Sequence, residues 1–279
     1  METYGFVKDD NVITKEEITL QTGVPIPQNI KDFLFDGWYD EIKDKVPNLK
    51  YSQKLSTFEI LSPIPNPSKV ICLVFNYKDH AREQNLLPPD EPSIIIKPRT
   101  ALNGATSDIV CPSFVFKLDY EIELALVIGK ECKNITEQTA KDAIFGYMIL
   151  NDVSARDIQA KDKQFTRAKG FDTFAPCGPW ITTADEVPDP QNLKMITKVN
   201  GDVRQSSSTS NMFLKIPTIV SMLSKVMTLE KGDIISTGTP AGVILNRPDA
   251  IYLKDGDLIE MEIEGLGKLR NKVKFVRYP

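Results

Sequence analysis

The pattern of apolar and polar positions divides the chain into many short elements. Beyond residue 68, runs rich in Ile, Val, Leu and Phe alternate with Gly, Pro, Asn and Asp, which is typical of short β-strands separated by turns. The runs that predict strands lie at 4–7, 70–75, 93–97, 123–128, 145–150, 234–236 and 258–263. Asn200-Gly201 joins two more apolar runs, 195–199 and 203–205, and this dipeptide predicts a tight hairpin turn.

Helical patterns are fewer. They predict helices over 30–45, over 136–143 with Thr136 as its cap, and over 218–227. Many short strands with few helices predict an α+β fold, a β-rich roll. The segment 61–68 holds three prolines, which make a stiff, extended connector. We therefore expect a small N-terminal domain over residues 1–62 and a main domain over residues 63–279.

Composition and charge exclude several classes of partner. The net charge of −4 and the pI near 5.3 provide no basic surface for nucleic acid or an anionic membrane. No apolar run approaches the ~20 residues that span a bilayer, and the first residues show no signal-peptide pattern. We expect a cytoplasmic protein with no nucleic-acid or membrane partner. The four cysteines are widely spaced, without a Cys-x-x-Cys pair, and are expected to be reduced.

Glu121 and Glu123 are the most unusual polar residues, because they enter the buried strand predicted at 123–128. Side chains alternate along a strand, so both carboxylates point to one face, where their like charges require a positive partner. Asp152 stands at the end of the next apolar run. Three carboxylates at two strand ends suit a hard divalent cation with open positions for water and substrate.

His80 is the only histidine of the chain, and Glu83 follows it by three residues. In a helical turn the two side chains lie together, and the carboxylate could orient the imidazole as a general base. The alternative is a surface histidine on a polar helix.

Four further residues are candidates for substrate contact or charge stabilisation. Arg156 and Gln159 follow Asp152 and could bind a substrate carboxylate, although a structural Asp–Arg pair explains the spacing equally well. Lys169 lies in an aromatic segment and could stabilise an enolate, or it could extend its ammonium group to water. Thr239 lies in a small-residue loop that could hold an anionic group or form a simple turn.

Together these segments resemble the fumarylacetoacetate hydrolase family, from about residue 70 to residue 273. The matching motifs are Asn76-Tyr-Lys-Asp-His80, Asp119-Tyr-Glu-Ile-Glu123, Asn151-Asp-Val-Ser-Ala-Arg-Asp157, Lys169 with Phe171-Asp-Thr-Phe174, Val199-Asn-Gly201 and Thr237-Gly-Thr-Pro-Ala-Gly242. The resemblance implies a mixed β-sandwich roll, a homodimer, and Mg²⁺ (with Mn²⁺ or Ca²⁺ as alternatives) held by three carboxylates. It also implies a small 2-oxo or β-diketo acid as substrate.

The resemblance assigns roles to these residues by position. Glu121, Glu123 and Asp152 would be metal ligands, and His80 with Glu83 would activate water. Lys169 would stabilise the enolate, and Arg156, Gln159 and Thr239 would contact the substrate.

The resulting hypothesis is a metal-dependent hydrolase that cleaves a C–C bond of an acylpyruvate or a fumarylacetoacetate-like acid through a metal-bound enolate. The first alternative is a lyase or isomerase using the same site, such as an oxaloacetate decarboxylase or a hydroxyheptadienedioate isomerase. The second is a metal-binding protein without catalysis.

Overall fold

The computed structural model describes residues 2–85, 87–247 and 250–277. The chain forms two compact units, Met1–Glu59 and Ile60–Pro279. None of the helices in the described part has the length and apolar character that crossing a membrane requires.

The first unit is a small sheet with three short helices. Strands β1 (Gly5–Lys8), β2 (Asn11–Thr14) and β3 (Gln53–Lys54) pair in that order. Helix α1 (Lys15–Thr22) begins at a capping box, in which the Thr14 N–H donates to the Glu17 carboxylate at 2.9 Å. The core of this unit is Ile13, Ile18, Val24, Phe33 and Ile42.

The single helix predicted over 30–45 is wrong. The structure has two short helices instead, α2 (Ile30–Phe35) and α3 (Trp38–Ile42). Gly37 separates them with a φ of 94°, a left-handed conformation that ends one helix and changes the chain direction.

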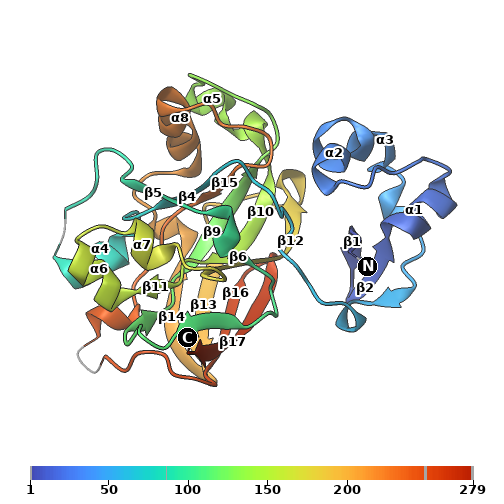
Figure 1. The fold of residues 1–279 in the computed structure, drawn as a ribbon. Coiled ribbons are helices and arrows are strands. Elements are labelled where there is room, and N and C mark those ends of the chain that lie inside the picture. The colour runs from blue at the N-terminus through green and yellow to red at the C-terminus, as the bar shows by residue number, and fades with distance from the viewer. Residues whose placement is uncertain (1, 86, 248–249, 278–279) are drawn as a thin grey trace. The chain divides into compact units, whose positions relative to one another are not determined.

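The second unit is built on two mixed sheets, which confirms the predicted α+β fold with curled sheets (Figure 1). The seven-stranded sheet has the order β5-β4-β15-β9-β10-β12-β6. Its strands are β4 (Val70–Leu73), β5 (Ile94–Lys97), β6 (Leu102–Asn103), β9 (Ile122–Ile128), β10 (Ile144–Asn151), β12 (Ala175–Thr183) and β15 (Ile234–Ser236).

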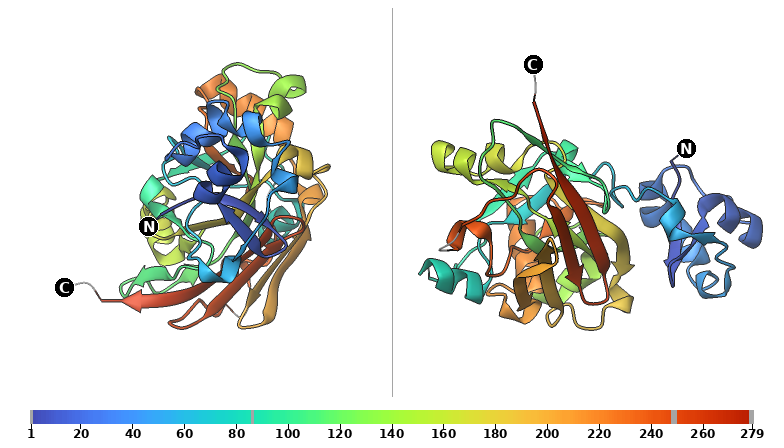
Figure 2. Two further views of the ribbon diagram at one scale, coloured as in Figure 1. Left: turned by 90° about the vertical axis from the view of Figure 1, so that its right-hand side faces the viewer. Right: turned by 90° about the horizontal axis from the view of Figure 1, so that it is seen from below.

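The second sheet has the order β14-β13-β16-β17-β7. Its strands are β7 (Ile109–Pro112), β13 (Lys194–Val199), β14 (Asp202–Ser208), β16 (Leu258–Ile263) and β17 (Gly267–Val276). They form one layer along the lower edge of the left-hand view in Figure 2. The predicted hairpin turn is confirmed, since Asn200 and Gly201 both have positive φ, 52° and 88°.

Helices cover two regions of this unit. Helix α5 (Glu137–Ala140), continued by a 3₁₀ turn, packs beside α8 (Ile216–Val226) (Figure 1). Both helices were predicted, with slightly different bounds. Helices α6 (Arg156–Asp162) and α7 (Thr166–Lys169) pack together near the two-stranded β8 (Leu118–Asp119) and β11 (Ser154–Ala155), whereas α4 (Lys78–Gln84) lies apart from them, as the right-hand view of Figure 2 shows. The candidate site residues lie on α4, α6 and α7, at the neighbouring ends of β9 and β10, and, for Thr239, in the loop after β15.

Candidate metal centre and active site

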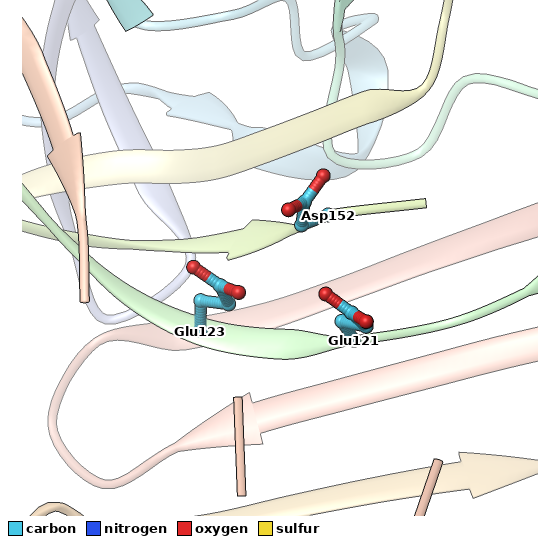
Figure 3. A group of neighbouring side chains, drawn as sticks. All are labelled: Glu121, Glu123 and Asp152. Carbon is cyan, nitrogen blue, oxygen red and sulfur yellow. The ribbon is translucent and has the colours of Figure 1, made fainter. Parts of the chain in front are cut away.

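Glu121, Glu123 and Asp152 meet at the adjoining ends of β9 and β10. The antiparallel register pairs Ile122 with Asn151, so Asp152 continues from β10 directly beside Glu121, and its N–H donates to the Glu121 carbonyl at 2.9 Å. One oxygen from each carboxylate lies within 4.8 Å of the others (Figure 3). In the described part of the chain this is the one group of three His, Cys, Asp or Glu residues close enough to share an ion. All three side chains are buried.

Buried cations contact two of the three carboxylates. The Lys169 Nζ lies 2.6 Å from Glu121 Oε2 and 2.7 Å from Asp152 Oδ2, so it bridges them. The Lys97 Nζ lies 2.5 Å from Asp152 Oδ1. Lys169 is only 4 % exposed, so the interpretation that its ammonium group reaches water is wrong.

Arg156 stands at the start of α6 and contacts the cluster through Glu121. Its Nη2 lies 2.5 Å from Glu121 Oε1, its Nε donates to Asp119 Oδ2 at 2.8 Å, and its Nη1 donates to Gln159 Oε1 at 3.0 Å. The interpretation of Arg156 as an ion-pair partner of Asp152 is therefore wrong, because its partners are Asp119 and Glu121. Asp152 is separated from α6 by the extended β11, so the two residues do not share a helical turn.

Glu123 differs from its two neighbours because its donors are uncharged. Its Oε2 accepts hydrogen bonds from Ser236 Oγ at 2.6 Å and from the Gly238 N–H at 3.0 Å. Its Oε1 is buried and has no hydrogen-bond partner among the described residues. A buried carboxylate oxygen without a partner is costly and marks a position that a ligand could satisfy.

The pKa values of the two glutamates are shifted in opposite directions. Burial would raise the pKa of Glu121, but the adjacent Lys169 and Arg156 outweigh it and lower that pKa to about 2. Burial, together with the charges of Asp152 and Glu121, raises the pKa of Glu123 well above its usual range. The network of Asp119, the three cluster carboxylates, Lys97, Arg156 and Lys169 contains one more acid than base, so it can accept positive charge.

His80 and Glu83 lie together on α4. His80 is 5 % exposed and stacks on Phe75 at 5.2 Å between ring centroids, so the surface-histidine interpretation is wrong. Its Nδ1 lies 3.5 Å from Glu83 Oε2, without hydrogen-bond geometry. The Glu83 carboxylate also accepts the Gly242 N–H at 3.0 Å. The imidazole thus stacks on Phe75, faces a carboxylate at Nδ1, and lies 3.1 Å from Gln84 Nε2 at its own Nε2.

Thr239 lies beside β9, in the loop that follows β15. Its hydroxyl donates to the Ile122 carbonyl at 2.9 Å and accepts from Gln205 Nε2 at 3.0 Å. The hydroxyl of Thr239 therefore already has hydrogen-bond partners within the protein, and so does the side-chain carbonyl oxygen of Gln159. The substrate contacts assigned to Thr239, Gln159 and Arg156 stay predictions.

Sequence reasoning missed Lys97 and Ser236, which contact the acids directly, and Asp119, which shares Arg156 with Glu121. Lys97 carried a usable signal, because a lysine that ends a run of three isoleucines is as unusual as two glutamates entering a strand. Asp119 and Ser236 gave none, since a polar residue at a strand end is ordinary.

Comparisons with known proteins agree on one family. Residues 69–274 match the sequence profile of the fumarylacetoacetate (FAA) hydrolase C-terminal domain. A mitochondrial oxaloacetate tautomerase, fahd2, from Xenopus laevis is 40% identical over 252 residues, covering 89% of this chain and 79% of that protein.

Two solved structures are also similar. The 5-carboxymethyl-2-hydroxymuconate delta-isomerase from Mycobacterium smegmatis is 43% identical with a TM-score of 0.72, covering 83% of this chain and 88% of that one. The maleylpyruvate hydrolase from Sphingobium sp. SYK-6 is 35% identical with a TM-score of 0.78, covering 98% and 96%.

Proposed function

Because the chain belongs to the fumarylacetoacetate hydrolase family, we propose that it is a divalent-metal-dependent enzyme that enolises a small 2-oxo acid. The observation that carries the proposal is the buried cluster of Glu121, Glu123 and Asp152. With Asp119, four buried acids face three buried cations, and Glu123 is the acid that none of these cations contacts directly, so the cluster can take up a further positive charge.

The residues of the cluster fit a hard cation. All the available donors are carboxylate oxygens, which Mg²⁺, Mn²⁺ and Ca²⁺ accept, and Glu123 Oε1 is a buried oxygen with no partner among the described residues. We assign Glu121, Glu123 and Asp152 as the ligands. The bound cation would supply Lewis-acid polarisation of the substrate's 2-oxo group.

The remaining residues would handle charge and protons. Lys169 is a buried cation beside two of the ligands, where it can stabilise the negative charge of an enolate. Arg156 holds Glu121 in place, and with Gln159 and Thr239 it forms the proposed substrate-contacting set. His80, with Glu83 at its Nδ1, can accept and return one proton.

Two reactions use such an enolate. In hydrolytic C–C cleavage, His80 takes a proton from water and the hydroxide adds to the distal carbonyl of a β-diketo acid. The C–C bond then breaks, its electron pair stays on the 2-oxo fragment as the enolate, and a proton returns to that carbon. The pairing of His80 with Glu83 supports this reaction, because the carboxylate stabilises the imidazolium.

The second candidate is tautomerisation or double-bond isomerisation of a 2-oxo acid. There a proton leaves one carbon of the substrate and returns to another atom, without addition of water. The likeness to the oxaloacetate tautomerase over most of the chain supports this candidate.

A substrate panel tests the proposal. The protein would be freed of metal with EDTA, supplied with Mg²⁺, and assayed on an acylpyruvate, fumarylacetoacetate, oxaloacetate and a hydroxymuconate-type dienoate. We expect activity on at least one of them, restored by Mg²⁺. His80→Ala should abolish acylpyruvate hydrolysis, because no group then takes the proton from water. Full activity of the metal-free protein on every accepted substrate would show the metal assignment to be wrong.

A further inference from the structure

Lys97 is a fully buried lysine at the end of β5. Its side chain has 0% relative exposure, although lysine is among the residues least often found inside proteins. A buried ammonium group is costly unless each of its donors has a partner.

All three donors of the Lys97 ammonium group have acceptors within reach. Besides Asp152 Oδ1, the Nζ lies 2.8 Å from the Phe174 carbonyl oxygen and 3.4 Å from that of Val153. These acceptors belong to two segments: the link between β10 and β11, which carries Asp152, and the segment that follows Lys169. Lys97 therefore joins the backbone around a proposed metal ligand to the backbone around the bridging lysine.

The sheet explains how Lys97 reaches this position. Lys97 pairs with Val70, Val70 with Ile234, and Ile234 with Val127, and paired residues on neighbouring strands point to the same face. Val127 lies four residues after Glu123 on β9, so its side chain shares the face of Glu123. Lys97 thus arises from the face of the curled sheet that carries the acids.

Asp152 has little else to fix its orientation. It stands in the two-residue link between β10 and β11, outside either strand. Its Oδ1 is held by Lys97 and its Oδ2 by Lys169, so the two lysines together set the plane of its carboxylate.

We propose that Lys97 is a positioning residue that holds Asp152 in the orientation required to bind a divalent cation. The inference rests on the proposed function, because it takes Asp152 to be a metal ligand. Lys97 does not touch the substrate in this role; it acts through Asp152 and through the segment after Lys169.

The alternative is that Lys97 only neutralises negative charge, and this role predicts the opposite change in cation affinity when the lysine is removed. If Lys97 served only to neutralise the acids, its removal would leave the cluster more negative and would strengthen cation binding. If Lys97 orients Asp152, its removal weakens binding, since loss of a group that orients a ligand typically costs about ten- to a hundredfold in metal affinity.

Mn²⁺ titration of metal-free protein, with free Mn²⁺ followed by electron paramagnetic resonance, separates these roles without relying on activity. The variant is Lys97→Met, whose unbranched side chain is one atom shorter and carries no charge. The matched control is Lys69→Met, because Lys69 also pairs with a buried carboxylate, Asp233, outside the cluster. Near-ultraviolet circular dichroism checks that each variant is folded.

We expect the Mn²⁺ dissociation constant of Lys97→Met to rise by about ten- to a hundredfold, and that of Lys69→Met to stay at the wild-type value. If Lys97→Met does not fold, Lys97→Gln, which keeps a hydrogen-bond donor, should show a rise in the same direction. Unchanged or tighter binding in the folded Lys97 variant overturns the positioning role and leaves the proposed function standing. Failure of the wild-type protein to bind Mn²⁺ would instead overturn the proposed function.

Discussion

Replacement of Glu123 by glutamine should uncouple the stability of the second unit from divalent cations. Glu123 is the cluster acid that no cation contacts directly, and its Oε1 is the buried oxygen without a partner among the described residues. The amide carbonyl oxygen of the new side chain could still accept the hydrogen bonds from Ser236 and Gly238. The substitution removes a buried carboxyl group whose pKa is raised well above its usual range by burial and by Asp152 and Glu121, so we expect the metal-free variant to be no less stable than the wild type.

The magnitude follows from linkage. A cation at about one hundred times its dissociation constant stabilises the folded protein by about 2.7 kcal/mol. For a unit of about 220 residues, that corresponds to a rise in Tm of roughly 5–10 °C. We expect this rise in the wild type and almost none in Glu123→Gln, which lacks one anionic ligand.

Calorimetric melts of EDTA-treated protein, with and without Mg²⁺, measure the effect. Asp233→Asn is the matched control, because it changes a buried carboxylate outside the cluster and should keep the Mg²⁺ shift even if its Tm falls. A Mg²⁺ shift in Glu123→Gln as large as in the wild type would refute the role of Glu123 as a ligand.

Three further predictions concern residues around the site and elsewhere in the same unit. Burial would raise the pKa of Glu83, but its contacts with His80 and the Gly242 N–H outweigh burial and lower that pKa. The charged carboxylate therefore stabilises the fold at pH values above the usual glutamate pKa, and this stabilisation is lost as the pH falls. Thermal melts of Glu83→Gln should therefore show a deficit at neutral pH that shrinks on acidification, and a deficit independent of pH would contradict this cause. Lys69→Met leaves Asp233 buried without its cation and should lower the free energy of unfolding, measured with urea, by about 3–5 kcal/mol. A loss below about 1 kcal/mol, the value typical of exposed ion pairs, would contradict this expectation. Gly170→Ala would place a Cβ 2.6 Å from the Thr166 carbonyl oxygen, so the segment after Lys169 must shift. We expect the free energy of unfolding to fall by about 1–3 kcal/mol and the activity to fall as well. Stability and activity equal to those of the wild type would contradict this close contact.

Much of the site was predictable from local pattern. Alternation along one strand placed Glu121 and Glu123 on one face, and the apolar run before Asp152 placed it at a neighbouring strand end. These predictions hold because they depend on backbone geometry that a few residues determine.

The partners of the charged groups were not predictable in the same way. Arg156 was expected near Asp152, four residues before it, but it contacts Asp119 and Glu121, which are more than thirty residues away. The pairing depends on where β8 and β11 come together, and sequence spacing carries no information about that. The helix broken at Gly37 shows the same limit on a smaller scale, because one backbone conformation overrode a continuous apolar pattern.

The most direct test of enolisation is exchange of substrate carbon-bound hydrogen with solvent. A 2-oxo acid from the substrate panel would be incubated with the protein in D₂O, and deuterium at C3 followed by NMR, for metal-free and Mg²⁺-supplied enzyme and for Glu123→Gln. We predict exchange above the uncatalysed rate only for the wild type with Mg²⁺, on a 2-oxo acid that the substrate panel shows the enzyme accepts. Absence of exchange on an accepted substrate, or equal exchange after removal of the metal, would contradict enolate formation at this cluster.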